Sequence, residues 1–168
     1  MLRVIPLSRE HDRNGFDCGA EPLNLYLRRN ARQHADKGIA RTFVLVDEDS
    51  PSGILGFFTL TFCNVESTEL PARLAKKLPT SAPALKLARL AILKSHQGQG
   101  LGGLLLSSAC RYCEDAEAIA GGIGLFVDAK DERAARFYSR FGFTPLHGDP
   151  LTLFLPMRTI REHNAATR

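Results

Sequence analysis

The glycine-rich segment Gln97-Gly98-Gln99-Gly100-Leu101-Gly102-Gly103 stands between a short apolar run, Leu85–Leu93, and a long helical pattern, Leu101–Ala120. Glycines leave the backbone amides uncrowded, and the first amides of a helix have no acceptor within that helix. A loop of this kind at the start of a helix binds the diphosphate of a cofactor. The sequence therefore predicts a site for a phosphorylated cofactor at Gln97–Gly103.

Two loop templates fit this segment. Gly98-x-Gly100-x-x-Gly103 matches the dinucleotide fingerprint, which directly follows its strand and opens a doubly wound sheet. Here Lys94–Gln97 intervenes and the segment lies in mid-chain behind a β-hairpin pattern, which disfavours a nicotinamide or flavin enzyme. A Walker loop is excluded because its Gly-Lys-Ser/Thr ending is missing. The second template is Gln97-x-x-Gly100-x-Gly102.

This second pattern resembles the acetyl-CoA loop, Q/R-x-x-G-x-G/A, of the GNAT acetyltransferases. Further along, Asp131–Phe143 is similar to the family's N-x-x-A-x-x-x-Y-x-x-x-G-F signature. The two motifs stand in the family's order, and the resemblance covers essentially the whole chain. It implies an acyltransferase that moves an acetyl group from acetyl-CoA to a primary amine. The implied fold is a single α/β domain, residues 1–168, with a mixed, mostly antiparallel sheet, flanking helices and a splayed fourth and fifth strand.

The resemblance also implies roles for particular residues. Tyr138 becomes the general acid, since a phenol with a pKa of about 10 stays protonated at neutral pH and can protonate a departing thiolate. The alternative is that Tyr138 is a core aromatic beside Phe137 and Phe141. Asp131 stands where the family commonly has Asn, and because a carboxylate would repel phosphate it is also expected to cap the helix. The implied cofactor-binding residues are Ala91, Ile92, Leu93, Gln97, Gly98, Gln99, Gly100, Leu101, Gly102, Gly103, Asp131, Ala134 and Phe137.

No side chain stands out as the general base. Glu66, Glu69, His34 and His96 are candidates by location, although such groups are more often solvated surface residues. A lysine ε-amine, with a pKa of about 10.4, needs a strong base, whereas an α-amine at about 7.7–8.0 is already partly neutral. A site without a dedicated base therefore suits an α-amine substrate.

Basic residues are unevenly distributed in a chain of net charge +4. Leu70–Cys113 contains no Asp or Glu, and a second basic cluster at Arg28–Arg41 has only Asp36 against it. Acid-free basic stretches favour a polyanionic partner such as RNA. The alternative is a solvated basic face with a local phosphate site. The candidate substrate-binding residues are Arg28, Arg29, Arg32, Lys76, Lys77 and Arg89.

The N-terminal half and the C-terminal end refine the resemblance. Phe16-Asp17-Cys18-Gly19, Leu23-Asn24-x-x-Leu27, Gly38–Val44 and Asp149–Met157 are similar to the toxin branch of the GNAT family, found in bacterial type II toxin–antitoxin modules. That resemblance implies acetylation of the α-amine of aminoacyl-tRNA, a block of translation and a ribbon-helix-helix antitoxin as partner. A homodimer is also expected. The alternatives are a GNAT that acetylates a small-molecule amine, a protein N-terminus or a lysine, and a non-catalytic CoA-binding module.

The remaining features are those of an ordinary globular protein. No apolar region of the length found in a signal peptide follows Met1-Leu2-Arg3, and no run approaches the roughly 18 residues of a membrane span, so no membrane association and a cytoplasmic location are expected. Cys110 and Cys113 form a C-x-x-C inside a helical pattern without further ligands, so free thiols are expected rather than a metal site. Expected strands are 2–7, 41–47, 53–64, 85–93, 125–129, 143–145 and 151–157; expected helices are 20–37, 101–120 and 131–141, before a polar tail at about 159–168.

Overall fold

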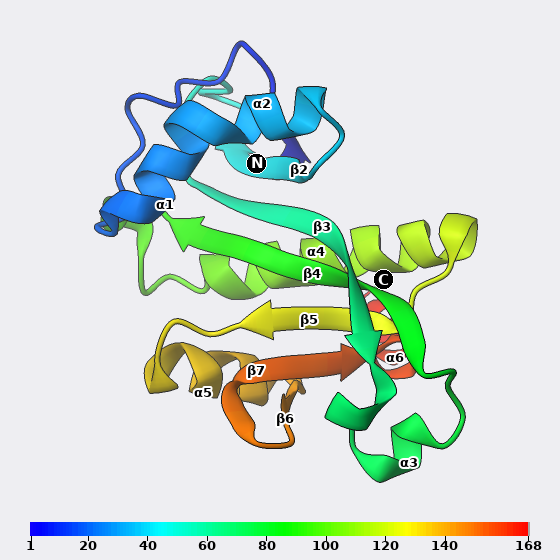
Figure 1. Cartoon of the computed structure of the whole chain (residues 1–168). Helices are drawn as coiled ribbons and strands as arrows, with labels where there is room; N and C mark the ends of the chain where they lie inside the picture. The colour runs from blue at the N-terminus through cyan, green and yellow to red at the C-terminus, as the bar shows by residue number, and fades with distance from the viewer. Residues whose placement is uncertain (168) are drawn as a thin grey trace. The chain divides into compact units, whose positions relative to one another are not determined.

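The computed structural model describes residues 1–167. Its strands form a seven-stranded sheet in the order β1-β2-β3-β4-β5-β7-β6 (Figure 1). The sheet is mostly antiparallel, and β4 and β5 form a parallel pair. This arrangement confirms the expected mixed α/β class. The chain divides into two compact units, the first made of Met1–Thr61 and Ala88–Ala109, the second of residues 62–87 and 110–167.

The first unit contains the N-terminal strands and the helical segment that crosses them. β1 (Leu2–Pro6) pairs with β2 (Arg41–Asp47), and β2 with the first half of β3 (Gly56–Glu66). The α2 helix (Ala31–Asp36) packs on β2, which Figure 1 shows from the helix side. The unit also holds the end of β4 (Ser81–Ile92) and the start of α4 (Leu101–Ala120). Its core joins the helical segment, β2, β3 and the end of β4 through apolar side chains that include Tyr26, Leu27, Val44, Phe57 and Ala91.

The expected helix at 20–37 is interrupted by a π-turn. It consists of α1 (Glu21–Leu25), the π-helix η1 (Tyr26–Asn30) and α2 (Ala31–Asp36). Leu27 and Ala31, four residues apart, are buried, and Asn24 and Tyr26 are buried as well. A π-turn bonds residues five apart, so the buried face shifts at this point from the period of an α-helix.

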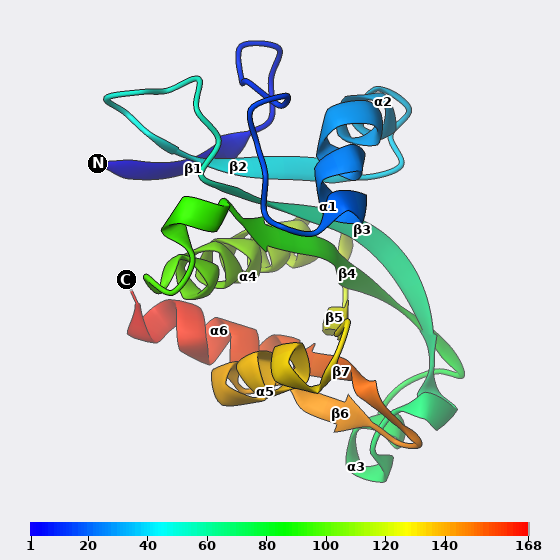
Figure 2. The same cartoon turned by 90° about the vertical axis from the view of Figure 1, so that its left-hand side faces the viewer.

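The second unit contains the C-terminal half of the sheet. Leu85–Leu87 of β4 pair with Leu125–Val127 of β5 (Gly124–Asp128), and β5 pairs with β7 (Asp149–Pro156) next to β6 (Thr144–Leu146). The helices α5 (Glu132–Phe141) and α6 (Met157–Ala166) lie against β7 in both views (Figures 1 and 2). η2 (Ser67–Glu69) and α3 (Ala72–Ala75) connect β3 to β4. Splaying of β4 from β5 past Leu87 stays a prediction.

Two expectations at the element ends were wrong. β4 begins at Ser81 instead of Leu85. Pro83 has no N–H to donate, but its carbonyl accepts from the Ile123 N–H at 2.9 Å, so the strand continues through the proline. The expected polar tail is the α6 helix, whose Ile160 and Asn164 are buried. The two buried apolar residues of this helix, Met157 and Ile160, and one buried amide give too weak a pattern to recognise in the sequence. Position 168 of the expected tail lies outside the described residues.

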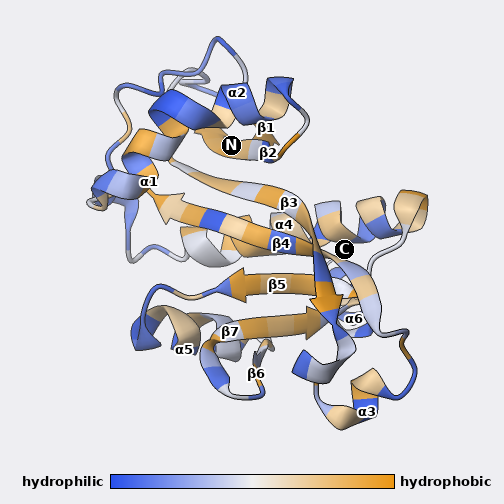
Figure 3. Ribbon diagram, viewed as in Figure 1, coloured by the Kyte–Doolittle hydropathy of each residue, from blue (hydrophilic) through white to orange (hydrophobic). Residues whose placement is uncertain are grey.

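The strands are coloured mainly as hydrophobic in Figure 3, whereas the helices carry more hydrophilic residues. Within residues 1–167, no helix is long and apolar enough to cross a membrane. The same residues contain no group of three His, Cys, Asp or Glu that could hold a metal ion. Cys110 and Cys113 are buried free thiols, and burial raises the pKa of each to about 12.

Gly124 offers a test of the packing between β5 and β7. A Cβ at this position would lie 2.3 Å from the Leu155 carbonyl oxygen and 2.6 Å from the Phe154 ring. We expect Gly124→Ala to lower the free energy of unfolding by roughly 2–3 kcal/mol, because backbone must move apart. Chemical denaturation measures this. Gly53→Ala, where the nearest atom is 3.6 Å away, is the control and should change little; an equal loss in both variants would contradict the packing argument.

Candidate active site

The predicted phosphate loop is an open backbone turn leading into α4. After β4, a short 3₁₀ turn, η3 (Lys94–His96), precedes Gly98 and Gly100, which both have a φ of 79°. That conformation disfavours other L-residues, and no atom lies within 4 Å of a Cβ placed on either glycine. The 20-residue helix α4 follows directly, and its first N–H groups have no acceptor within that helix. The loop therefore fits a diphosphate.

Gln97 uses its side chain to hold the loop. Its Nε2 donates to the Cys18 carbonyl at 2.8 Å and to the Ile92 carbonyl at 2.9 Å. Its backbone N–H donates to the Lys94 carbonyl at 3.4 Å. Direct binding of the cofactor by Gln97 stays a prediction, whereas its side chain joins the Cys18 and Ile92 segments in this structure.

The end of β4 lies close to β3. The Leu93 N–H donates to the Leu55 carbonyl at 2.9 Å. A Cβ on Gly56 would stand 3.0 Å from the Ala91 carbonyl oxygen and 2.9 Å from Ile92 Cδ1. Ala91 is buried, whereas Ile92 and Leu93 are half-buried. Glycine at position 56 is therefore what allows this approach of β3 to the predicted cofactor-binding strand.

Tyr138 lies on α5 in the second unit. The helix starts as expected: the Asp131 side chain accepts from the Ala134 N–H at 2.8 Å, which confirms the helix cap, and Gly142 ends the helix at a φ of 114°. Tyr138 is 7% exposed and meets Phe137 and Phe143 edge-on.

Burial raises the pKa of Tyr138 to about 12. The phenol is therefore protonated throughout the neutral range, as a general acid requires. The same burial fits a core aromatic, so the catalytic role stays a prediction. Ala134 and Phe137, on the same helix, are half-buried.

Four of the predicted substrate-binding residues share the first unit. Arg29 is exposed on η1, while Arg28 there and Arg32 on α2 are partly buried. Arg28 pairs with Glu21 at 3.5 Å, and its Nε is buried without a hydrogen-bond partner. The Arg89 guanidinium, from β4, lies 3.5 Å from the centroid of the Tyr26 ring on η1.

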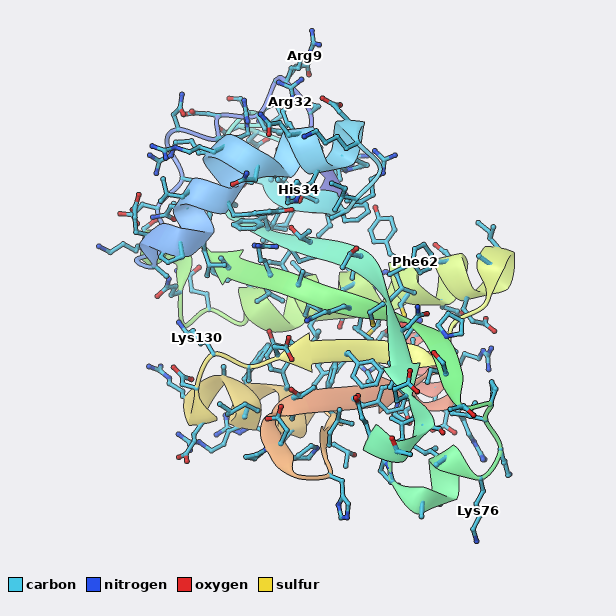
Figure 4. The ribbon with its side chains drawn as sticks, in the orientation of Figure 1. Arg9, Arg32, His34, Phe62, Lys76 and Lys130 are labelled. Carbon is cyan, nitrogen blue, oxygen red and sulfur yellow. The ribbon has the colours of Figure 1, made fainter. Side chains whose placement is uncertain are left out.

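The structure thus brings Arg89 to the segment that carries Arg28, Arg29 and Arg32. Figure 4 shows Arg32 and His34 on this segment. Tyr26, which the sequence did not single out, joins Arg89 to this segment: its ring lies under the guanidinium, and its hydroxyl pairs with His34 Nδ1 at 3.0 Å. No sequence pattern signals this, because the contact depends on the π-turn and on a distant strand.

Lys76 and Lys77 are exposed at the end of α3 in the second unit, where Figure 4 shows Lys76 pointing outward.

The candidate bases are occupied or solvated. His34 is paired with Tyr26, and His96 Nδ1 pairs with Ser95 Oγ at 2.9 Å. Glu66 and Glu69 are exposed. The structure therefore singles out none of the four as a base.

Comparisons with known proteins agree with this geometry. Residues 38–145 match the family model described as the acetyltransferase (GNAT) domain. The tRNA-acetylating toxin of Mycobacterium tuberculosis is 32% identical over 155 residues, with 92% of each chain covered. AtaT complexed with acetyl-methionyl-tRNAfMet is 37% identical, with a TM-score of 0.89 over 96% of this chain and 98% of that one.

A tyrosine-to-phenylalanine mutant of AtaT, bound to the C-terminus of the antitoxin AtaR and acetyl-CoA, is 34% identical. Its TM-score is 0.80 over 96% of this chain and 97% of that one. The family match spans both the glycine loop and the Tyr138 helix. The chain belongs to the GNAT acetyltransferase family.

Proposed function

We propose that this protein moves an acetyl group from acetyl-CoA to the α-amine of aminoacyl-tRNA, and that it blocks translation as the toxin of a toxin–antitoxin pair. The observation that carries the proposal is the glycine loop, with Gly98 and Gly100 in the left-handed region at the start of α4. Similarity to a tRNA-acetylating toxin along nearly the whole chain supports the choice of acceptor.

The first unit supplies the groups that would hold acetyl-CoA. The open amides of Gly98–Gly103 would bind the diphosphate, as helix N-termini commonly do. Ala91, Ile92 and Leu93 at the end of β4 would accept the pantetheine arm, and a backbone N–H there can polarise a carbonyl. When bound, acetyl-CoA supplies an acyl group already activated as a thioester. That the AtaT mutant was solved with acetyl-CoA supports this assignment.

Tyr138 would supply the proton that the departing thiolate needs. The phenol is protonated at neutral pH, and burial raises its pKa further, to about 12. The substrate α-amine is already partly neutral near pH 8, so solvent can accept its proton without a dedicated base. This fits a site in which His34 and His96 are engaged elsewhere.

The tRNA would be held by cations on both units. Arg28, Arg29, Arg32 and Arg89 form one basic group, and Lys76 and Lys77 a separate one. The relative solved with acetyl-methionyl-tRNAfMet supports RNA as the polyanion. By the same reasoning the partner is an antitoxin, as for AtaT. We further propose that this antitoxin is a ribbon-helix-helix protein, and that the toxin is a cytoplasmic homodimer with one catalytic domain.

Replacing Tyr138 by phenylalanine tests the general acid. The Phe ring keeps the contacts with Phe137 and Phe143 and loses only the hydroxyl. We expect transfer of radiolabelled acetyl from acetyl-CoA to Met-tRNA to slow by about 100-fold or more. Induced expression should arrest bacterial growth for the native chain and not for the variant.

The matched control is Tyr112→Phe on α4, which should retain activity. Both variants should unfold near the native melting temperature. Full activity of Tyr138→Phe would exclude the hydroxyl as the acid and leave Tyr138 as a core aromatic. A native chain that labels small amines but no aminoacyl-tRNA would contradict the proposed acceptor.

Charge reversal tests the RNA-binding cations. Arg29→Glu with Arg32→Glu should weaken tRNA binding by about 10-fold or more at low salt, because lost phosphate contacts release fewer counterions. The slope of log Kd against log salt should fall by about 1.5 for two lost contacts. Filter binding at several salt concentrations measures both.

The control for charge is Arg3→Glu with Arg158→Glu, which are exposed side chains outside the group. Equal losses in the two double variants would show a general charge effect. Unchanged tRNA binding after reversal at Arg29 and Arg32 would remove this segment from the RNA surface.

A further inference from the structure

Asn24 is a buried polar residue on α1, only 3% exposed, and both polar atoms of its side chain are used. Its Oδ1 accepts from the Cys18 N–H at 2.9 Å. Its Nδ2 donates to Asp17 Oδ1 at 2.9 Å and to Glu21 Oε2 at 3.3 Å. Asn24 therefore holds the turn at Asp17–Gly19 against α1.

The turn is fixed from its other side as well. Asp17 Oδ1 also accepts from the Gly19 N–H at 2.8 Å, and Gly19 has a φ of 89°. These two hydrogen bonds, from Gly19 and then from Asn24, keep the pKa of the Asp17 carboxyl below its usual value. Phe16, just before the turn, packs edge-on against Phe57 at 5.5 Å between ring centroids.

The carbonyls of this turn hold the approach to the glycine loop. The Asp17 carbonyl accepts from the Lys94 N–H at 2.9 Å. The Cys18 carbonyl accepts from Gln97 Nε2 at 2.8 Å. Lys94 starts η3 and Gln97 follows its end, directly before Gly98. The place of the loop thus depends on a turn far away in the sequence.

We propose that Asn24 is a positioning residue for the acetyl-CoA loop. Its amide fixes the Asp17–Gly19 turn, and the turn's two carbonyls fix Lys94 and Gln97 and so the amides that follow. This inference rests on the proposed function, since it concerns the same cofactor loop. A loop that is already ordered loses less conformational entropy when a ligand binds.

The direct test is Asn24→Ala, with CoA as the probe. We expect the Kd for CoA, measured by calorimetry, to rise about 10-fold. The KM for acetyl-CoA should rise by a similar factor, while kcat at saturating acetyl-CoA stays within about twofold. A role limited to stability would not split KM from kcat in this way.

A matched control removes another buried hydrogen bond of the same unit. The hydroxyls of Thr42 and Thr59 lie 2.7 Å apart and are buried between β2 and β3. Thr42→Val should lower the melting temperature without changing the Kd for CoA. Equal weakening of CoA binding in Thr42→Val would overturn the proposal, because any loss of stability would then suffice.

A double-mutant cycle tests the route through Gln97. If Asn24 acts through the Cys18 carbonyl, Asn24→Ala and Gln97→Ala disrupt the same link. The Kd of the double variant for CoA should then equal that of whichever single variant binds less tightly. Two independent losses of about 10-fold each would instead raise the Kd about 100-fold above that of the native chain. Additive losses would overturn this route.

Asp17→Ala keeps the proposal testable if Asn24→Ala does not fold. Asp17 is exposed, and its loss removes the carboxylate that joins Gly19 to Asn24. It too should weaken CoA binding with kcat retained. A native chain that does not bind CoA would overturn the proposed function itself. A native chain that binds CoA, with Asn24→Ala or Asp17→Ala binding it equally well, would overturn only the role of Asn24.

Discussion

Glycine-rich backbone has more conformational freedom to lose than any other backbone, and the surroundings of Gln97–Gly103 restrict it. The Gln97 amide bridges two carbonyls from segments far apart in the chain, at Cys18 and Ile92. Before Gln97, the Lys94 N–H donates to the Asp17 carbonyl, and after Gln97 only Gly98–Gly100 precede the start of α4 at Leu101. The amides that we propose to face a phosphate are thus left open while the residues beside them are fixed.

The same segment of chain serves the second proposed ligand. The turn at Asp17–Gly19 leads into α1 and η1, where Tyr26 packs under the guanidinium of Arg89. Cation–π contact restricts a side chain that would otherwise be free to move, and the Tyr26 hydroxyl is restrained by His34. The N-terminal helical segment therefore orders both the neighbourhood of the cofactor loop and one cation of the basic group.

The fold class was predicted from the resemblance to the GNAT family, and the helices that carry the motifs from local signals in the sequence. Glycine is the residue that a left-handed backbone favours, so Gly98 and Gly100 indicate that conformation directly in the sequence. Asp131 and Gly142 are residue types that commonly begin and end a helix, and they do so for α5. The task of Gln97 and the burial of Asn24 depend on partners distant in sequence. A polar side chain that is fully bonded inside the fold looks the same, in a sequence, as one in water.

The C-terminal helix was missed for a related reason. Much of what the α6 side chains contribute is polar: Asn164 Nδ2 donates to the Cys110 carbonyl at 3.2 Å, and Arg161 pairs with Glu117 at 2.6 Å. A docking face made of an amide and an ion pair does not produce the apolar period by which amphipathic helices are recognised. Only Met157 and Ile160 carry that signal.

The π-turn at Tyr26–Asn30 has a consequence for chain length. An α-helix turns about 100° per residue, so one added residue would normally rotate everything after it off its face. A turn that bonds residues five apart absorbs the extra residue locally. A related chain one residue shorter at this place would form an uninterrupted α-helix and still bury the counterpart of Ala31. In such a chain, the side chains of the turn itself, the tyrosine and the arginines, would point in other directions than they do here.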